Sequence, residues 1–291
     1  MTPELAAIKA AVEDALSHHL PAESAIAQPL IDAMRYAALS GGKRLRPMLV
    51  CAACESFGGD LADALAPACA VEYVHAYSLV HDDLPAMDND ELRHGLPSTH
   101  IAYGQAAAIL TGDALLSLAF EVLADAAAVP LQIRLQCVQL LARASGWEGM
   151  VGGQHFDLAS EGKQLGLTDL KRLHAAKTGA LIKSAVQMGA LFGGVSAESF
   201  VLMSEFGDRL GLAFQVIDDV LDVTATTETL GKPAGSDLIA NKSTFPALMG
   251  VDEAVELAEN LLTDCHQLLE RANVNSGLLK ELSELAVRRQ F

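Results

Sequence analysis

The sequence predicts an all-α protein, a single large helical bundle of ten or more helices around a central cavity. Apolar residues recur at the spacing of an α-helix along most of the 291 residues. No segment shows the alternation of a β-strand or the turn signal of a β-hairpin. No linker or short-period repeat divides the chain, so we expect one domain over residues 1–291.

Proline and glycine mark the ends of many predicted helices. The first helix ends before Pro21, and the second ends at a Ser-Gly-Gly run that begins at Ser40. Prolines open the next two helices, with Pro67 in the first turn of the fourth. The expected helices cover residues 4–19, Pro29 to Ser40, Pro47 onward, 66–81, 105–128, 131–145, 147–160, 168–191, 197–225, 245–272 and 275–289.

Composition excludes several classes of protein. The chain is 51% hydrophobic and 20% charged, which is enough for a large core. A net charge of −17 argues against binding to nucleic acid, which needs a basic surface. We find no apolar run long enough for a stable membrane insertion and no signal sequence, so we expect a cytoplasmic protein.

Cysteine usage does not suggest a disulfide framework. The five cysteines are an odd number, and only Cys51 and Cys54 form a C-x-x-C pair. That pair lies in an alanine-rich helical pattern and has no second pair to complete a metal site. We expect buried thiols, with metal or redox chemistry as the alternative.

Two acidic clusters follow apolar helices. The first places Asp82, Asp83, Asp88, Asp90 and Glu91 within ten positions. Pro85 interrupts regular helical spacing, so Asp82 and Asp83 should end a helix and Asp88 should return on the following turn. Carboxylates this close repel one another unless a cation lies between them.

The second cluster consists of Asp218, Asp219 and Asp222. Their i, i+3 and i, i+4 spacing lets one helix face present three carboxylates. Oxygen ligands favour a hard ion such as Mg²⁺, whose coordination shell is commonly completed by substrate phosphates and water. A solvated acidic cap explains one cluster easily but explains two clusters beside buried helices less well.

Cations complete the predicted site. The run Gly41–Pro47 (Gly-Gly-Lys-Arg-Leu-Arg-Pro) places three cations after two glycines, which is typical of an anion-binding loop in so acidic a chain. Further basic residues occur at Arg93, Lys177, Lys183, Lys232 and Lys242, of which Lys177 and Lys232 lie beside threonine or glycine. Metal ions held by aspartates within a ring of lysine and arginine are suited to diphosphate groups.

The segment around residue 75 remains open to two interpretations. Glu72 and His75 have the i, i+3 spacing of a di-iron bundle motif, but that fold needs a second copy and the chain has none. His75 is therefore either a hydrogen-bonded core histidine or a side chain that faces the cavity.

Four motifs in this order resemble the trans-isoprenyl diphosphate synthases. They are Gly41–Pro47, the D-D-x-x-x-x-D of Asp82–Asp88, Lys177-Thr178-Gly179, and Phe214–Asp222. The resemblance extends from Gly41 to Pro246, and the detailed match is to the bacterial synthases that make farnesyl diphosphate. It implies an all-α homodimeric enzyme that condenses isopentenyl diphosphate with dimethylallyl or geranyl diphosphate, giving farnesyl diphosphate and pyrophosphate.

The resemblance also implies roles for individual residues. About three Mg²⁺ ions, with Mn²⁺ as an alternative, would be held with substrate phosphates by the two aspartate clusters, Asp82, Asp83, Asp88, Asp218, Asp219 and Asp222. The allylic diphosphate would contact Arg93, Lys177, Thr178, Gln215, Lys232 and Lys242. Isopentenyl diphosphate would contact Gly42, Lys43, Arg46, His75 and His94.

Three further expectations follow from the resemblance. Tyr77 and Ser78, just before the first cluster, would limit the length of the product chain. Arg288 and Arg289 would belong to a C-terminal tail that covers the site. The synthases commonly have Arg-Arg where this chain has Arg93-His94, so one contact to isopentenyl diphosphate should differ in strength.

Other functions remain to be distinguished. A helical metal phosphohydrolase would need another well-placed histidine, which the sequence does not mark. A terpene cyclase would not need the cations of Gly41–Pro47. A non-catalytic synthase subunit would commonly lack one aspartate cluster, whereas this chain has both. Geranyl and geranylgeranyl diphosphate synthases are alternatives within the same family.

Overall fold

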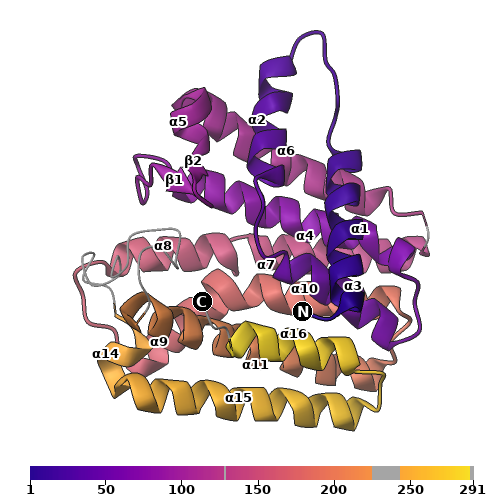
Figure 1. The fold of residues 1–291 in the computed structure, drawn as a ribbon, viewed down its shortest axis with the longest axis vertical. Helices are drawn as coiled ribbons and strands as arrows, with labels where there is room; N and C mark the ends of the chain where they lie inside the picture. The colour runs from indigo at the N-terminus through magenta and orange to yellow at the C-terminus, as the bar shows by residue number, and fades with distance from the viewer. Residues whose placement is uncertain (128, 225–242, 289–291) are drawn as a thin grey trace.

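Helices form nearly all of the structure, a computed structural model that describes residues 1–127, 129–224 and 243–288 (Figure 1). The all-α prediction with ten or more helices is confirmed. The elements are α1 (Pro3–His19), α2 (Gln28–Leu39), α3 (Leu45–Ser56), α4 (Leu61–Asp82), β1 (Leu92–Arg93), β2 (Leu96–Pro97), α5 (Thr99–Tyr103), α6 (Gln105–Ala124), α7 (Leu131–Ser145), α8 (Met150–Ser160), α9 (Leu167–His174), a π-helical turn (Ala175–Gly179), α10 (Ala180–Phe192), α11 (Ala197–Thr224), α14 (Phe245–Met249), α15 (Val251–Ala272) and α16 (Gly277–Val287).

The main core lies among α3, α4, α10 and α11. Nearly every side chain of α3 and α10 is buried, as their alanine-rich and leucine-rich sequences require. Helix α6 packs along α4, and α15 packs along α11 (Figure 1). The end of α1 and the start of α2 project from the rest of the bundle and are joined at the top of Figure 1, whereas the remainder of both helices packs on it. This arrangement places the C-terminal end of α4 and the helix α11 around one central space.

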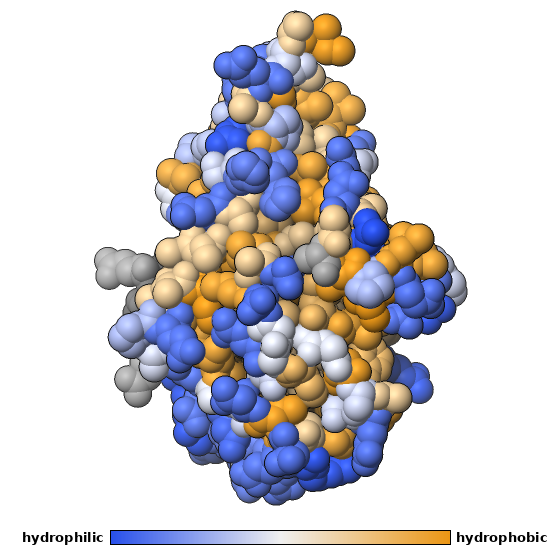
Figure 2. All heavy atoms as spheres, turned by 90° about the vertical axis from the view of Figure 1, so that its right-hand side faces the viewer, coloured by the Kyte–Doolittle hydropathy of each residue, from blue (hydrophilic) through white to orange (hydrophobic). Residues whose placement is uncertain are grey.

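Hydrophilic and hydrophobic side chains are unevenly distributed over the surface. Figure 2 shows hydrophilic side chains gathered at the lower end of one face and hydrophobic ones mainly in its middle. Helix α15, which lies at that lower end in Figure 1, begins with acidic residues and buries only one side of its amphipathic sequence.

The cysteines are all buried free thiols, as expected. Burial raises the pKa of Cys54 and Cys69 to about 12, so both thiols are protonated and unreactive.

Helix α6 meets the length and composition criteria for a membrane span, although the sequence was expected to contain no such segment. Its 20 residues are long and apolar enough by length and composition alone. One such helix is weak support for a span, because core helices of soluble proteins have the same properties. Helix α6 packs against α2, α4, α5 and α7.

Several predicted helix boundaries were wrong. Helix α3 begins at Leu45 rather than Pro47, and α4 begins at Leu61, so that Pro67 lies inside the helix rather than in its first turn. Burial of Ala64, Pro67 and Ala68 against the core offsets the cost of about 3 kcal/mol for an interior proline.

Two long predicted helices are divided, and others differ at their ends. The segment 168–191 contains a π-helical turn between α9 and α10, and the segment 245–272 is interrupted at Gly250, whose φ is +88°. Helix α6 ends at Ala124 rather than near residue 128, and the short helix α5 was not predicted.

The expectation that the chain has no β-hairpin was also wrong. Strands β1 and β2 pair antiparallel, with Arg93 opposite Leu96. His94 and Gly95 form the two-residue turn with φ of +52° and +77°, the left-handed values of a type I′ turn. A histidine at the first position lacks the strong signal of Asn-Gly, which explains why the pattern was missed. The Tyr36 hydroxyl of α2 donates a 2.6 Å hydrogen bond to the Pro97 carbonyl and ties the hairpin to the bundle.

Candidate active site

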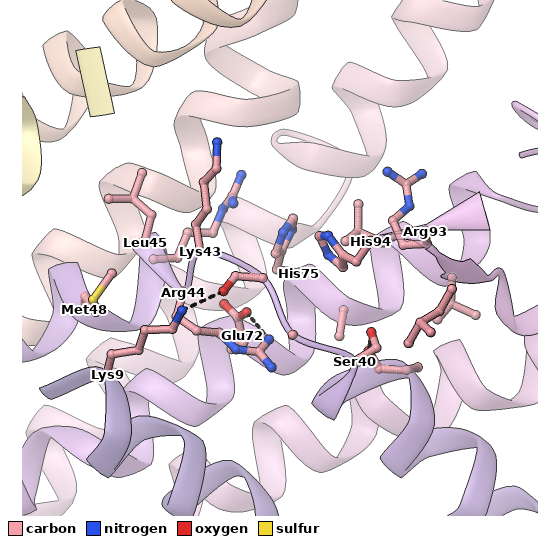
Figure 3. Close-up of a pocket in the computed structure, with 18 of the residues that line it drawn as sticks. Lys9, Ser40, Lys43, Arg44, Leu45, Met48, Glu72, His75, Arg93 and His94 are labelled. Atoms are coloured by element: carbon pink, nitrogen blue, oxygen red, sulfur yellow. Dashed lines mark hydrogen bonds and ion pairs between the residues drawn. The ribbon is translucent and has the colours of Figure 1, made fainter. Parts of the chain in front are cut away.

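A cavity of about 780 Å³ lies between the Gly41–Pro47 loop, α4, the β1–β2 hairpin, α11 and α16. All five residues expected to bind isopentenyl diphosphate line it, and Arg93 lies beside them. Figure 3 shows Lys43, His75, Arg93 and His94 directed toward the same space. The structure therefore brings together Gly42, Lys43, Arg46, His75 and His94.

Backbone conformation shapes the cationic loop. Gly41 and Gly42 have φ of +94° and +118°, values that other residues rarely adopt. The chain turns at these glycines and begins α3 at Leu45, which carries Lys43 and Arg46 to the cavity wall. A Cβ on Gly42 would lie 3.6 Å from the His94 ring, so the hairpin and the loop are in close contact.

Both histidines of the cavity are uncharged at neutral pH. Burial lowers the pKa of His75 well below its usual value, and nearby Arg46, His94 and Arg93 lower it further. The pKa of His94 is lowered by partial burial and then by the cations Arg93, Arg44 and Lys43. Cations thus dominate this wall, which favours a polyanionic ligand.

Arg93 connects the hairpin to the end of α4. Its guanidinium contacts the buried Asp83 carboxylate, with Nε at 3.1 and 3.3 Å from the two oxygens and Nη2 also in contact. Asp90 lies 3.5 Å from Nη2 on the outer side. Burial raises the pKa of Asp83, and the hydrogen bonds and charge of Arg93 oppose that rise. Asp83 and Arg93 both line the cavity as an ion pair.

The first aspartate cluster has the predicted geometry. Helix α4 ends at Asp82, Asp83 caps it, and the Asp88 amide donates a 2.9 Å hydrogen bond back to the Asp82 carbonyl. Burial raises the pKa of Asp82 to about 6; Lys177 lowers it, and Asp88 raises it. Asp82 therefore has Asp88 and Lys177 as electrostatic neighbours, although Lys177 is far from both aspartates in the sequence.

Lys177 has a partner that sequence reasoning missed. Its Nζ lies 2.5 Å from the carboxylate of Asp157 on α8. Asp157 is an isolated acid in a largely apolar helix, a pattern that could have marked it. Lys177 and Thr178 lie in the π-helical turn, a local widening found often at functional sites. Thr178 lines the cavity and donates a 2.8 Å hydrogen bond to Gln215 Oε1.

The three aspartates of the second cluster differ in their surroundings. Asp218 lines the cavity. Asp219 is only 2% exposed and accepts hydrogen bonds of 3.0 Å from Gln215 Nε2 and from the Phe245 amide. Asp222 is buried as well. Asp219 is thus already bonded to protein donors, and Asp218 is the member of this cluster that reaches the cavity.

His174 is an uncharged neighbour of Asp219. Burial lowers its pKa to about 4. Its Nε2 lies 3.7 Å from Asp219, and its ring stacks on Phe245 at 5.6 Å. At neutral pH this contact is not an ion pair, and sequence patterns did not single out the residue.

The donor set fits a hard divalent ion bound together with an anionic ligand. Asp83 and Asp218 come to one cavity from α4 and α11, and Asp82 has the raised pKa of a carboxylate that a cation would relieve. Across the described ranges, no three acidic, histidine or cysteine side chains converge closely enough to hold an ion by themselves. Phosphate oxygens would therefore have to supply several ligands, as is usual for Mg²⁺.

Tyr77 and Ser78 lie on α4 outside the lining of the cavity. Ser78 donates a 2.8 Å hydrogen bond to the His75 carbonyl. The Tyr77 ring is 5% exposed and meets His81 edge-on at 5.8 Å. His81 Nε2 lies 3.0 Å from the Ile109 carbonyl, directly over Gly112, where a Cβ would come within 2.1 Å of that nitrogen. The absence of a side chain at Gly112 therefore lets His81 pack behind Tyr77.

The C-terminal end of the described chain reaches the cavity. Arg288 lines it and makes a two-pronged ion pair with Glu259 of α15, at 3.0 and 2.8 Å. Lys232, Lys242 and Arg289, which the sequence analysis also assigned to the site, lie outside the described residues.

Comparisons with known proteins agree with this geometry. The model of the family "Polyprenyl synthetase" matches residues 27–284. The chain is 47% identical over 267 residues to a farnesyl diphosphate synthase of Escherichia coli strain K12, covering 90% of this chain and 89% of the relative. It is 46% identical over 258 residues to a chloroplastic geranylgeranyl pyrophosphate synthase of Arabidopsis thaliana, covering 88% and 74%.

A solved structure shows that the likeness extends to the whole fold. The geranyltransferase of Helicobacter pylori, complexed with magnesium and isoprenyl diphosphate, superposes with a TM-score of 0.86. Its sequence is 32% identical, and the match covers 99% of this chain and 97% of that one. The predicted resemblance is therefore confirmed, and the chain belongs to the polyprenyl synthetase family.

Proposed function

We propose that this prenyltransferase condenses isopentenyl diphosphate with dimethylallyl and then geranyl diphosphate, releasing farnesyl diphosphate and pyrophosphate. The observation that carries the proposal is one cavity with a cationic wall at Lys43, Arg46 and His75 and an acidic wall at Asp83 and Asp218. Such a cavity suits two diphosphates, one bound directly by cations and one bound through metal. The identity to the Escherichia coli synthase supports this reaction.

Isopentenyl diphosphate is assigned to the cationic wall. Lys43 and Arg46 supply charge, and neutral His75 supplies a hydrogen-bond donor or acceptor within it. His94 adds a group whose proton uptake depends on the bound diphosphate. This binding fixes the reacting double bond beside the allylic carbon, and positioning of two substrates supplies much of the catalysis.

The allylic diphosphate is assigned to the acidic wall. We assign its metal ions to Asp82, Asp83, Asp88 and Asp218, with Asp219 and Asp222 behind them, and we name Mg²⁺, about three ions, with Mn²⁺ as the alternative. When bound, these ions neutralise the negative charge that develops on the departing diphosphate. Arg93 and Lys177 add fixed positive charge, and Lys232 and Lys242, outside the described residues, are assigned the same role.

The reaction balances without another reagent. The allylic C–O bond breaks, and its electron pair leaves with the diphosphate. The double bond of isopentenyl diphosphate supplies the electron pair of the new C–C bond. One proton is then lost to the released pyrophosphate, which gives a product five carbons longer. We assign to the oxygen dipoles of Thr178 and Gln215, which are hydrogen-bonded to each other, the stabilisation of the intermediate positive charge.

We propose that Tyr77, which lies outside the lining of the 780 Å³ cavity, forms the floor of a separate space that the hydrocarbon chain of the product enters. Its buried ring lies on α4 between the cavity wall at His75 and the aspartates that end the helix. Identity alone does not fix product length, because a relative named for geranylgeranyl pyrophosphate is about as similar as one named for farnesyl diphosphate. Ser78, beside Tyr77, is assigned to the same limit.

We further propose a cytoplasmic homodimer. Large apolar side chains are exposed on the consecutive helices α5 to α8 and in the loop between α7 and α8, a concentration typical of an interface: Ile101, Ile109, Leu110, Leu135, Trp147 and Val151. The five free, buried thiols suit a reducing compartment. Light scattering during gel filtration would measure the mass of the particle in solution.

One assay tests the function. Purified protein is incubated with Mg²⁺, dimethylallyl diphosphate and radiolabelled isopentenyl diphosphate, and the chain length of the product is read by chromatography. The proposal requires a fifteen-carbon product. A ten- or twenty-carbon product would keep the family and change the assignment, whereas absence of any prenyl product would overturn it.

A further inference from the structure

In the sequence, Arg44 lies between Lys43 and Arg46, the two cations assigned to isopentenyl diphosphate. Its own guanidinium is instead bonded to other groups of the protein. The residue is only 6% exposed. Its Nε and Nη2 contact the two oxygens of Glu13 on α1 at 2.8 and 3.2 Å, and its Nη1 contacts Glu72 on α4 at 2.7 Å. Nη2 also donates a 2.8 Å hydrogen bond to the Ala38 carbonyl of α2. Most of the donors of Arg44 are therefore used by the protein.

The backbone at Arg44 is strained in the same place. Its φ of +54° and ψ of +33° are left-handed, a conformation that costs a non-glycine residue about 1–2 kcal/mol. Arg44 is also the N-cap of α3, so this turn decides where α3 begins and where Arg46 points. Such a conformation persists only when the surroundings hold it. The contacts to Glu13, Glu72 and Ala38 come from three separate helices and provide that support.

Helix α1 contacts the loop at a second point. Lys9 Nζ donates a 3.1 Å hydrogen bond to the Gly42 carbonyl, just before Lys43 (Figure 3). Lys9 and Glu13 are one helical turn apart, so a single face of α1 holds both ends of the turn. Glu72 precedes His75 by three residues on α4, which connects the turn to the helix that carries His75.

We propose that Glu13 and Glu72, acting through Arg44, are positioning residues for the isopentenyl diphosphate site. They fix the left-handed turn that aims Lys43 and Arg46 into the cavity, and they do not touch the substrate themselves. The inference rests on the proposed function of that wall. It assigns a role in substrate binding to the N-terminal helix, which contributes no residue to the predicted motifs.

Electrostatics alone predicts the opposite effect, which makes the proposal testable. Glu72→Gln and Glu13→Gln each remove a negative charge beside a cavity that binds an anion. If only charge mattered, both variants would bind isopentenyl diphosphate more tightly. If position matters, both bind it more weakly, because a displaced turn moves Lys43 and Arg46 from the diphosphate.

The experiment measures KM for each substrate and kcat in both variants, with Glu270→Gln as the matched control on an exposed ion pair. We expect KM for isopentenyl diphosphate to rise at least about tenfold, while KM for the allylic substrate and kcat change less than about twofold. Glu270→Gln should resemble the wild type. An unchanged or lower KM for isopentenyl diphosphate would overturn the proposal, and so would an equal rise in both KM values.

Two features keep the test decisive. Glu72 is almost fully buried, whereas the Glu13 side chain is 33% exposed, so Glu13→Gln decides the matter if Glu72→Gln does not fold. Calorimetric binding of isopentenyl diphosphate without metal separates this proposal from the reaction. A wild type that binds but makes no product would refute the function alone, whereas equal binding by wild type and Glu13→Gln would refute the positioning role alone.

Discussion

Gly153 of α8 lies against the backbone of Lys177, so closely that a Cβ on Gly153 would be 2.3 Å from the Lys177 amide nitrogen. On the other side, a Cβ on Gly211 of α11 would be 2.7 Å from the Gly179 Cα. The π-helical turn that carries Lys177 and Thr178 is thus held between two helices that approach it without side chains. The width of that turn sets how far the two side chains extend toward the site.

Gly153→Ala should therefore impair catalysis from outside the cavity. A methyl group has no room, so α8 or the π-helical turn must shift, at a cost of about 1–3 kcal/mol in stability. We expect kcat to fall at least about tenfold and KM for the allylic diphosphate to rise, as measured by steady-state kinetics. Gly277→Ala, whose Cβ would meet nothing within 4 Å, is the control. Wild-type kinetics in Gly153→Ala would show that the turn tolerates displacement.

A second prediction concerns both aspartate clusters. Asp82→Ala and Asp218→Ala should each lower turnover by about 10³-fold or more, since each removes charge that holds the ionising diphosphate. The exposed Asp208, which pairs with Lys183, provides the control Asp208→Ala. A near wild-type rate in Mg²⁺ for either site variant would show that its cluster is only an acidic cap.

Asp82→Asn should separate function from stability. Burial raises the pKa of Asp82 to about 6, so at pH 7.5 the carboxylate is charged in a place that disfavours its charge. The folded protein therefore loses stability as pH rises from the pKa of Asp82 in the unfolded chain to its pKa in the folded protein. Asparagine carries no charge at either pH, so it removes this loss. We expect the variant to be inactive in Mg²⁺ yet, when both proteins are free of metal, to melt no lower than the wild type in calorimetry. A clear loss of melting temperature would indicate a structural role.

A third prediction uses His94. Its pKa is below 6.5 in the free protein, and a bound diphosphate should raise it. Protonated His94 then adds affinity for isopentenyl diphosphate. This added affinity is fully present below the pKa of His94 in the free protein and is lost as pH rises through its pKa in the complex. KM for isopentenyl diphosphate should therefore rise between about pH 6 and 8.5.

His94→Arg isolates this effect, because arginine stays charged throughout and the substrate's own titration is common to both proteins. The variant should show a flatter rise and a lower KM at alkaline pH, with little change in KM for the allylic substrate. His94→Ala should lose affinity for isopentenyl diphosphate alone. Identical pH profiles for wild type and His94→Arg would mean that His94 is not a ligand.

The fourth prediction concerns product length. Tyr77→Ala should open the floor of the pocket and yield geranylgeranyl or longer products, read by chromatography of the dephosphorylated alcohols. The ring is fixed by His81, which is itself seated over Gly112, so the change should be confined to this end of the pocket. An unchanged farnesyl product would remove Tyr77 from control of chain length.

The sequence predicted most of the helices because burial imposes a regular spacing that can be read locally. It missed features that depend on contacts between distant segments. The π-helical turn needs Gly153 and Gly211, which no local pattern connects. The hairpin depends on a two-residue turn at His94 without a strong turn sequence.

The residues of the site were predicted as a group better than as individuals. The Gly41–Pro47 motif placed Lys43 and Arg46 together because it follows a recognisable helix end, whereas His75 was assigned to the same wall only through the family resemblance. The motifs gave no means to distinguish Arg44 from Lys43 and Arg46. Arg44 is buried and ion-paired, so its role is structural. Asp157 was missed because its only signal is a single acid in a largely apolar helix, which belongs to none of the four motifs.

The most direct test of metal-assisted condensation measures two products in one reaction. Purified protein receives dimethylallyl diphosphate and isopentenyl diphosphate, and farnesyl diphosphate and pyrophosphate are both quantified, with Mg²⁺ and after chelation. Each farnesyl chain requires two condensations, so we expect two pyrophosphates per farnesyl diphosphate, no turnover after chelation, and recovery when Mg²⁺ is restored. Undiminished synthesis in chelator, or pyrophosphate release without prenyl product, would contradict the account.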